Sequence, residues 1–547
     1  MFVVIIKEKI GHWLKSKYNI LFLFILFFSI FLRLYNYPEA VSMEVDGFRH
    51  VKDLWVSWQS HTPLIFSIDI QDAGFKLGPW YYYSLLPFLY FFNFNPKAFD
   101  LLELSLFIAS LPILYNIVSR LFNKKTALIS ALLYGTSFIM YGNSMTSWNP
   151  DSLPFFVLFF VWSLLNSEML INNKKTPYWT WVGLSIAYSI APSFHFSIVP
   201  LCAVIFAYIL YRFKLFIRQP LLIFIAVIFP ILSYLPPLTW DIKNNFSNLK
   251  NLLLFLVKPF SFGGQSTEPF LTKIIDASKY TYGFIQFIFT QNIFPNFQYP
   301  VWQNLITEIL IFLILAGAVI LIKNIWHDKS VRFAKIILLS FFVVSVLSIF
   351  ATHLGYKTRY IYCSIPLYYI FVSIGLGYLI QRKRIILRFF SLLVLIALIL
   401  INLNSYYEYR QGHQIVLNLL FDTKAHKIIE KSGALISVDD YMQVVDYIYK
   451  NYHEKDVQNI IRISAVDSNN GFKENMITND NFNYILQWRY NMKCDYDPAA
   501  QPSFSVVYFK HEYDDQLKNI KQYYQKDCDF IIHNLCVMDL QAKIEKN

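Results

Sequence analysis

Long apolar runs alternate with short polar segments over the first three quarters of the chain. The first run covers residues 18–35 and the last covers residues 386–404. A bilayer core needs about 20 mostly apolar residues in helical conformation, so runs of this length predict membrane spans. The pattern predicts a polytopic α-helical membrane protein with about eleven transmembrane helices. The expected spans are residues 18–35, 98–121, 126–142, 152–168, 178–193, 196–212, 220–238, 305–323, 336–352, 361–380 and 386–404.

Two further stretches, residues 80–94 and 268–289, mix apolar and aromatic side chains with polar ones. Tyr and Trp are enriched where the membrane meets water. We therefore expect both stretches to form helices that lie at the outer membrane surface rather than across the bilayer.

The charged residues separate the two sides of the membrane. Only 15% of the residues are charged, against about 25% in a soluble protein. The formal net charge of +12 would suit a nucleic-acid partner, but Lys and Arg cluster between the apolar runs, as at Lys174, Lys175 and residues 382–384. These clusters fall on one side when the spans alternate, and the positive-inside rule makes that side cytoplasmic. We expect a multi-pass protein of the plasma (inner) membrane, N-terminus inside, surrounded by membrane lipids and without a nucleic-acid partner.

The basic N-terminus followed by an apolar run also resembles a secretory signal, and residues 40–42 would suit cleavage. The run is longer than a typical signal core and contains Arg33. We interpret it as an uncleaved first span.

The character of the chain changes near residue 405. We expect residues 1–404 to form the transmembrane domain and residues 405–547 a small extracytoplasmic α/β domain, with a helix near 444–452 and strands near 460–463 and 504–509. This tail contains Cys494, Cys528 and Cys536. Two of them could form a disulfide, and the sequence leaves the pairing open. No Cys or His spacing typical of a structural zinc site is present.

Ionisable residues gather at the expected outer ends of the spans, which suits a catalytic site at the membrane face better than a conduction path through its middle. Glu44 and Asp46 follow the first span directly. An ionised carboxylate there could act as a general base, or could simply solvate a loop. Asp151 follows a proline and precedes a span, as a helix N-terminal residue would. Lys76 could anchor at the interface by snorkelling, and His195 could be a structural histidine.

The order of several motifs resembles one family of membrane enzymes. The sequence Glu44-Val-Asp46 is followed by Lys76-Leu-Gly-Pro-Trp-Tyr-Tyr-Tyr83, by Ser147-Trp-Asn-Pro-Asp151-Ser-Leu-Pro154, and late in the chain by Arg359-Tyr360. This order and sidedness resemble the GT-C membrane glycosyltransferases, in the branch of the protein O-mannosyltransferases and the aminoarabinose lipid A transferases. The resemblance covers about residues 1–404.

The resemblance implies transfer of a sugar, with inversion, from a polyprenyl-phosphate-sugar donor to an acceptor hydroxyl on a lipid, glycan or protein. It implies that Asp46 is the first-loop catalytic acid, with Glu44 beside it. Asp151 matches the acid of the second outer loop, while Lys76, Arg359 and Tyr360 match groups near the donor phosphate. In this chain Leu77 and Gly78 separate Lys76 from the proline of the family motif.

Other interpretations stay open at this stage. A divalent metal could be held by Asp46, Asp151 and His195. The chain could instead be a polysaccharide polymerase or ligase organised around arginines of an outer loop. A transporter or flippase would be expected to contain paired repeats and broken midplane helices, and a non-catalytic membrane anchor would not need carboxylates gathered at outer span ends. The sugar and the acceptor are not specified by the sequence.

Overall fold

The structure is a computed structural model of the full 547-residue chain. The residues it describes are 15–35, 45–70, 74–145, 148–257, 270–290, 301–327, 331–351, 362–410, 438–451, 461–466, 472–474, 484–485, 488–490, 504–508, 530–532 and 535–539. Glu44, Arg359, Tyr360, Cys494 and Cys528 lie outside these residues, so the expectations for them are not tested.

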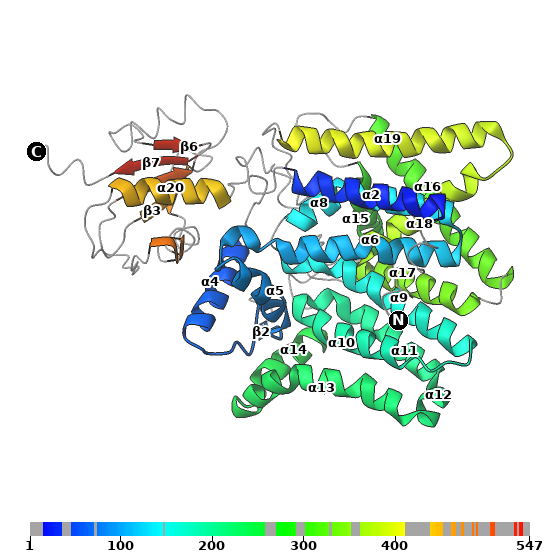
Figure 1. Ribbon diagram of the computed structural model, residues 1–547, viewed down its shortest axis with the longest axis horizontal. Helices are drawn as coiled ribbons and strands as arrows, with labels where there is room; N and C mark the ends of the chain where they lie inside the picture. Colours follow the sequence, from blue (N-terminus) through cyan, green and yellow to red (C-terminus); the bar gives the residue numbers. More distant parts are fainter. Residues whose placement is uncertain are drawn as a thin grey trace, which may run out of the picture.

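Long helices run side by side between two ends of the molecule (Figure 1). Seven helical segments in the described part of the chain are long and apolar enough to cross a membrane. They are Lys17–Leu34 (α2), Pro96–Leu121 (η1, Pro96–Ala98, with α6, Leu101–Leu121), Asn149–Asn172 (η2, Asn149–Ser152, with α9, Leu153–Asn172), Pro220–Lys243 (α13), Asn304–His327 (within α16, Val301–His327), Tyr362–Ile380 (η5, Tyr362–Ser364, with α18, Ile365–Ile380) and Ile385–Tyr406 (within α19, Ile385–Arg410). The predicted class, a helical polytopic membrane protein, is confirmed.

The other four expected spans are also helical but are not among these seven. They correspond to α7 (Lys124–Gly135) with α8 (Phe138–Met145), α10 (Tyr178–Phe194), α11 (Val199–Tyr211) and α17 (Arg332–Ala351). The expected span 126–142 is interrupted after Gly135, where the backbone N–H of Met140 bonds to the Ser137 hydroxyl at 3.2 Å and α8 starts anew. The count of eleven spans therefore stays a prediction.

Helix α18 lies in the interior of the bundle, because residues on every side of it are buried. It packs closely on α16. A Cβ atom added at Gly317 would lie 2.3 Å from the carbonyl oxygen of Phe371, and one at Gly375 would lie 2.6 Å from that of Leu313. Small residues at helix contacts allow such close backbone approach in membranes. By contrast, α2, α13 and α19 expose large apolar side chains, as the outer helices of a membrane bundle would.

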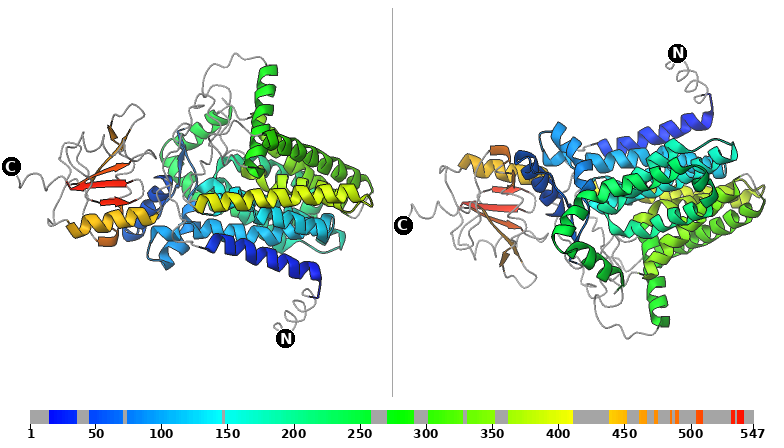
Figure 2. Two further views of the ribbon diagram at one scale, coloured as in Figure 1. Left: turned by 90° about the horizontal axis from the view of Figure 1, so that it is seen from above. Right: turned by 90° about the horizontal axis from the view of Figure 1, so that it is seen from below.

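A group of shorter elements covers the end of the bundle where α6 and α9 begin (Figures 1 and 2). They are α4 (Val45–Gln59), the antiparallel pair β1 (Asp69–Ile70) and β2 (Phe75–Lys76), α5 (Trp80–Phe91), η3 (Phe196–Ile198) and α14 (Ser247–Val257). We call this group the cap. The expected helix at 80–94 is present as α5, but Tyr81, Tyr82, Leu85 and Leu89 are buried, so one face packs into the cap instead of lying free.

The expected helix at 268–289 is α15 (Phe270–Phe289). Its second half is packed into the bundle: Phe284 and Ile288 are buried, and the hydroxyl of Tyr369 on α18 donates to the Ile288 carbonyl at 3.1 Å. This part of α15 is therefore not the surface-lying helix that we expected. The apolar residues near its end, Phe284, Ile285, Phe287, Ile288 and Phe289, are buried and explain the difference.

The tail contains the expected helix and strands. Helix α20 (Val438–Asn451) accompanies a five-stranded sheet of order β4-β3-β5-β7-β6 (Figure 1). Strands β3 and β5 are parallel and the other pairs are antiparallel, with Ile463 opposite Val506 and Val506 opposite Val537. The strands are β3 (Ile461–Val466), β4 (Phe472–Glu474), β5 (Phe504–Tyr508), β6 (Phe530–Ile532) and β7 (Leu535–Asp539).

The tail contacts the cap. The hydroxyl of Tyr484 donates to the Phe94 carbonyl at 3.1 Å, and the indole N–H of Trp488 donates to the Asn93 carbonyl at 2.8 Å. Asn93 and Phe94 follow Phe92, the C-cap residue of α5. The tail and the cap thus lie at the same end of the bundle.

Candidate functional site

Helices α4 and α5 meet through a chain of polar side chains. Nδ1 of His50 lies 2.9 Å from the hydroxyl of Tyr82, which donates to a carboxylate oxygen of Asp53 at 2.9 Å. His50 and Asp53 are three positions apart and so share a face of α4. Because Tyr82 donates to Asp53, its oxygen can accept from His50, which fits the tautomer with the proton on Nδ1.

Burial is the main cause of the pKa shifts of His50 and Asp53. Burial, with a smaller contribution from Arg49, lowers the pKa of His50 to about 3, so the imidazole is neutral near pH 7. Burial also raises the pKa of Asp53, while the hydrogen bond from Tyr82 opposes that shift. Asp46 lies on α4 one turn before His50. Helix α4 thus carries both the expected catalytic acid, Asp46, and the buried polar side chains of His50 and Asp53.

Three carboxyl groups gather around Tyr81, the residue before Tyr82. They belong to Asp100, the N-cap of α6, to Glu103 in the first turn of α6, and to Asp151 in η2. All three side chains are buried. Burial raises the pKa of the Tyr81 hydroxyl well above its usual value, and the charges of Glu103, Asp151 and Asp100 raise it further. Tyr81 therefore remains a protonated hydroxyl among the acids.

Two hydrogen bonds fix the position of η2, which carries Asp151. The Ser152 hydroxyl donates to the Glu103 carboxylate, lying 2.7 and 2.6 Å from its two oxygens. The side-chain amide of Asn149 donates to the Phe194 carbonyl at the end of α10. Pro150 suits the first turn of this short helix, because its missing N–H is not needed there. The turn that carries Asp151 is thus hydrogen-bonded to both α6 and α10.

A small cavity of about 10 Å³ lies beside Glu103 and Asp151, with room for about one water molecule. Two of its lining residues, Phe107 and Ser144, contact the buried Arg33 of α2. The Arg33 guanidinium carbon lies 3.5 Å from the centre of the Phe107 ring, and Nε donates to Ser144 at 2.9 Å. A buried positive charge therefore lies on the bundle side of the acids.

Lys76 is placed in β2, next to this region. Its backbone N–H donates to the Asn248 side chain at 2.6 Å, and its carbonyl accepts from the same side chain at 3.2 Å, while its own side chain is exposed. The preceding residue, Phe75, packs its ring against Phe196 of η3, with centroids 6.3 Å apart. The Lys76 strand and the His195 turn therefore share one packed layer of the cap.

His195 stabilises the start of η3 in that layer. It is buried, and its Nδ1 accepts from the backbone N–H of Ser197 at 3.2 Å and lies 2.9 Å from the Ser197 hydroxyl, so it caps η3. Among the described side chains, which do not include that of Asp46, no group of three His, Cys, Asp or Glu residues could hold a metal ion. The suggested metal ligands Asp46, Asp151 and His195 stay a prediction, because the Asp46 side chain lies outside the described residues.

The sequence did not single out Tyr81, Tyr82, His50, Asp53, Asp100 or Glu103. A signal was available for Glu103, which is an acid inside an expected apolar span and so a functional candidate by default. Of the expected residues, Lys76 and His195 lie in or beside the cap elements β2 and η3, and Asp46 lies on α4. Asp151 lies in η2, which contacts α10, and α10 in turn contacts α5 and η3 of the cap.

Comparison with known proteins supports the resemblance seen in the sequence. Residues 77–240 match the family described as dolichyl-phosphate-mannose-protein mannosyltransferase. The chain is similar to the archaeal oligosaccharyltransferase AglB of Archaeoglobus fulgidus in complex with an inhibitory peptide and a dolichol-phosphate: the TM-score is 0.52 at 10% identity, covering 91% of this chain and 70% of that chain. An apo oligosaccharyltransferase of the same organism gives a TM-score of 0.52 at 11% identity, covering 89% and 65%. ArnT from Cupriavidus metallidurans bound to undecaprenyl phosphate gives 0.47 at 10% identity, covering 95% and 97%.

No curated protein matches the chain. At identities this low, likeness to the solved structures with TM-scores of 0.52 establishes the fold alone. The resemblance expected from the sequence is confirmed: the chain has the fold of the GT-C membrane glycosyltransferases and is similar, over residues 77–240, to the dolichyl-phosphate-mannose-protein mannosyltransferase family.

Proposed function

We propose that this protein is a membrane glycosyltransferase that moves a sugar from a polyprenyl-phosphate donor to an acceptor hydroxyl, with inversion at the sugar carbon. One observation carries the proposal most strongly. The buried cluster of Tyr81, Glu103 and Asp151 lies at one end of the bundle, inside the segment that matches the mannosyltransferase family.

The chemistry needs a base and a group that stabilises the leaving phosphate. The acceptor oxygen attacks the anomeric carbon, the bond from that carbon to the phosphate oxygen breaks, and polyprenyl phosphate leaves with the electron pair. Asp46, with Glu44 beside it, takes the proton of the acceptor hydroxyl. Arg359 and Lys76 hold the phosphate, since a guanidinium can bind two phosphate oxygens and an ammonium adds a point charge. Tyr360 lies next to Arg359 in the chain, and we place it at the donor as well.

In this scheme Asp151, on η2, contacts the substrate. The bond between Ser152 and Glu103 joins the turn that carries Asp151 to α6 and so restrains the backbone at Asp151. Positioning of this kind is what a transfer reaction needs, because misplacement by about 1 Å can cost about 100-fold in rate. The neutral His50 and protonated Tyr81 offer hydrogen bonds without adding charge.

The membrane arrangement belongs to the same proposal. The cap and the tail lie at the end of the bundle where α6 and α9 begin (Figure 1), whereas the basic clusters Lys124-Lys125 and Lys174-Lys175 follow the opposite ends of these two helices. We place the cap and residues 405–547 outside the plasma membrane and the N-terminus in the cytoplasm, following the positive-inside rule. Gathering of acids at one end, rather than along the middle, favours an enzyme over a transporter.

The test is a transfer assay with purified protein in detergent. A polyprenyl-phosphate sugar labelled in the sugar is supplied with lipid, glycan or peptide acceptors, and a nucleotide sugar serves as the alternative donor. We expect labelled product and free polyprenyl phosphate only with the lipid-linked donor. Use of the nucleotide sugar alone would contradict the proposal. So would movement of the intact donor across a proteoliposome membrane without cleavage, which would indicate a flippase.

A further inference from the structure

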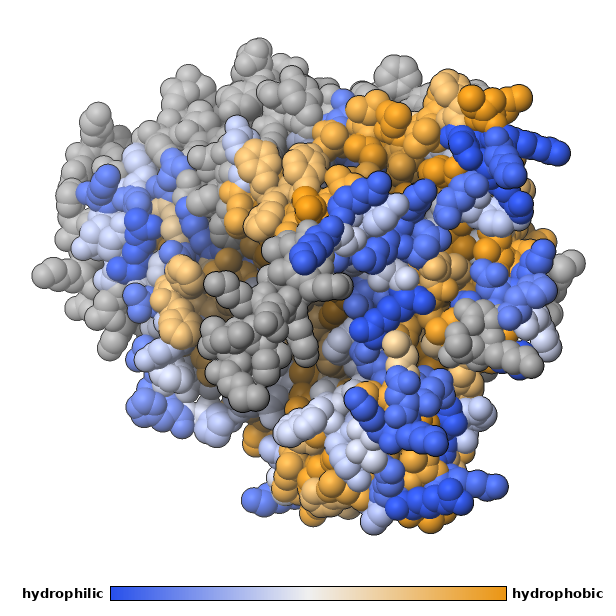
Figure 3. Space-filling model, turned by 45° about the vertical axis from the view of Figure 1, so that its right-hand side comes forward, coloured by the Kyte–Doolittle hydropathy of each residue, from blue (hydrophilic) through white to orange (hydrophobic). Residues whose placement is uncertain are grey.

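A second cavity lies at the opposite end of the bundle from the cap. Its volume is about 480 Å³, within the usual range for small-ligand sites. Three arginines line it from three different elements: Arg120 in the last turn of α6, Arg212 at the C-cap of α11, and Arg332 at the start of α17. The cap site, by contrast, uses the first turn of α6. Figure 3 brings this end forward and shows hydrophilic side chains gathered between hydrophobic surfaces.

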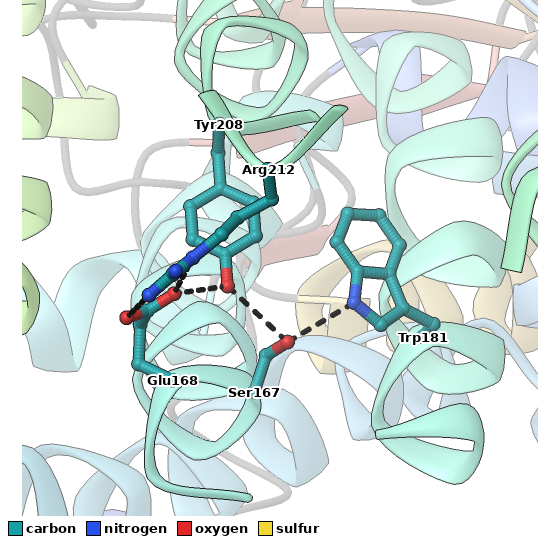
Figure 4. A network of polar contacts seen from close by, with 5 residues as sticks. All are labelled: Ser167, Glu168, Trp181, Tyr208 and Arg212. Carbon is teal, nitrogen blue, oxygen red and sulfur yellow. Dashed lines mark hydrogen bonds and ion pairs between the residues drawn. The ribbon is translucent and has the colours of Figure 1, made fainter. Parts of the chain in front are cut away.

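Among the described residues that line the cavity, Glu168 is the single acid, and it is paired with one of these arginines. Nε of Arg212 donates to Oε1 of Glu168 at 2.9 Å, its NH2 group pairs with Oε2, and the Tyr208 hydroxyl donates to Oε1 at 2.5 Å (Figure 4). The network continues to Ser167, which accepts from the Trp181 indole N–H at 3.0 Å. Glu168 therefore neutralises Arg212 and fixes it in place.

The charges of the other two arginines are not balanced in this way. The hydrogen bonds described for Arg120 go to the Asn166 amide oxygen at 2.6 Å and the Met169 sulfur at 3.3 Å. Those described for Arg332 go to the carbonyls of Ile325 and Trp326. All these partners are neutral. The cavity thus keeps an excess of positive charge, and an anion would be attracted to it.

The walls of the cavity suit an amphiphile. Leu121, Leu165 and Val331 supply apolar surface, and the ring of Phe333 stacks on that of Tyr211 with centroids 4.1 Å apart. A free anion would need only the charges. An anionic lipid needs charges beside apolar surface at the end of a membrane bundle, which is what this cavity offers.

We propose that this cavity binds the phosphate-bearing headgroup of an anionic membrane phospholipid, with Arg120 and Arg332 on the phosphate and the fixed Arg212 beside them. Basic residues that only follow the positive-inside rule would extend separately into water. Here three of them, from three elements, line one cavity. The proposal is independent of the transfer reaction at the other end of the bundle.

The test is lipid binding by purified protein, measured by native mass spectrometry and by titration with short-chain phosphatidylglycerol or phosphatidylcholine. We expect wild type to prefer phosphatidylglycerol about tenfold or more. The double variant Arg120→Gln with Arg332→Gln should lose this preference, because charge-assisted hydrogen bonds to phosphate are the strong ones. Arg120→Lys with Arg332→Lys should retain most of it.

The matched control is Lys214→Gln with Arg218→Gln, which removes two exposed charges from α12 (Phe213–Arg218) outside the cavity lining. An equal loss in this control would overturn the proposal in favour of general surface charge. Competition by millimolar inorganic phosphate as effective as that by the lipid would overturn the lipid as occupant. Thermal unfolding of each variant in detergent checks that the fold is intact.

Discussion

The hydroxyl of Ser152 lies 2.7 Å and 2.6 Å from the two carboxylate oxygens of Glu103. Both side chains are buried. This contact joins the turn that carries Asp151 to the first turn of α6, although the two residues are far apart in sequence. The placement of a proposed substrate-side acid therefore depends on a residue that would have no contact with substrate.

Removing the Glu103 carboxylate, which accepts the hydrogen bond from Ser152, tests this dependence. Glu103→Ala leaves the Ser152 hydroxyl buried without its partner and should reduce stability by about 1–3 kcal/mol. It should also reduce sugar transfer, because the Asp151 turn loses its anchor. Glu103→Gln retains an acceptor oxygen and should preserve most of both. Thermal unfolding in detergent and the transfer assay measure the two effects, and full activity of Glu103→Ala would show that the anchor is unnecessary.

The close contact of α16 with α18 gives a second prediction. Gly317→Ala or Gly375→Ala would place a Cβ atom 2.3 or 2.6 Å from a backbone carbonyl oxygen of the other helix. The helices would have to separate, and overpacking of this kind costs about 1–3 kcal/mol. The control is Gly183→Ala, whose Cβ would meet the Phe159 ring at 3.4 Å. We expect lower unfolding temperatures for the first two variants only. Equal temperatures for all three would contradict the packing described.

The apolar pattern predicted most of the bundle because membrane spans need long apolar runs whatever they pack against. The break between α7 and α8 was missed, since Gly135 and Ser137 in an apolar run look like ordinary small residues of a span. No helix is predicted from the sequence for the α4 segment, although Phe48, Val51 and Leu54 are buried at helical spacing. That amphipathic signal was short and was outweighed by the surrounding polar residues.

The cap site was predicted only in part for a different reason. Asp151 and Lys76 lie next to recognisable motifs, so the family resemblance identified them. Glu103 lies in an apolar run, and its partner Ser152 is brought to it only by the packing of α9 on α6. Tyr81 and Tyr82 were interpreted as part of an aromatic interface stretch. Which of several tyrosines turns toward buried acids is decided by tertiary packing.

His50 predicts a pH dependence of stability. Burial lowers its pKa in the folded protein to about 3 from a usual 6.5. The unfolded chain therefore binds a proton that the folded protein does not, so stability should be full above about pH 6.5 and fall as the pH drops toward 3. Asp53, whose pKa is raised, acts in the opposite sense at acidic pH.

The measurement compares unfolding temperatures at pH 7.5 and pH 5.0 for wild type, His50→Gln and the exposed-site control His61→Gln. The difference between the two pH values should be smaller in His50→Gln than in wild type, and unchanged in His61→Gln. Because Asp53 is present in all three proteins, its contribution largely cancels. An unchanged difference in His50→Gln would mean that His50 does not titrate as a buried neutral group.

The proposed orientation predicts where reporters are found. A reporter fused after Asn404 or at Asn547 should report the extracytoplasmic side, and one at Lys174 or Lys383 the cytoplasm, because the basic clusters lie at one end of the bundle. Paired alkaline phosphatase and fluorescent protein fusions measure this in cells. With a cytoplasmic N-terminus, a cytoplasmic tail would mean an even number of spans. The cap lies at the same end of the bundle as the tail, so it would then be cytoplasmic, which contradicts the proposed orientation.

The most direct measurement of the proposed function concerns Asp46. Asp46→Asn keeps size and hydrogen bonding but removes the charge, so transfer of labelled sugar from the polyprenyl-phosphate donor should fall by about 100-fold or more. Glu44→Gln should cost less, and Glu308→Gln, which alters an exposed acid on α16, should cost nothing. Unfolding temperatures should stay close to that of wild type in all three. A loss confined to Asp46→Asn and, to a smaller extent, Glu44→Gln is the predicted result; near-normal turnover by Asp46→Asn would contradict the assignment of the catalytic base.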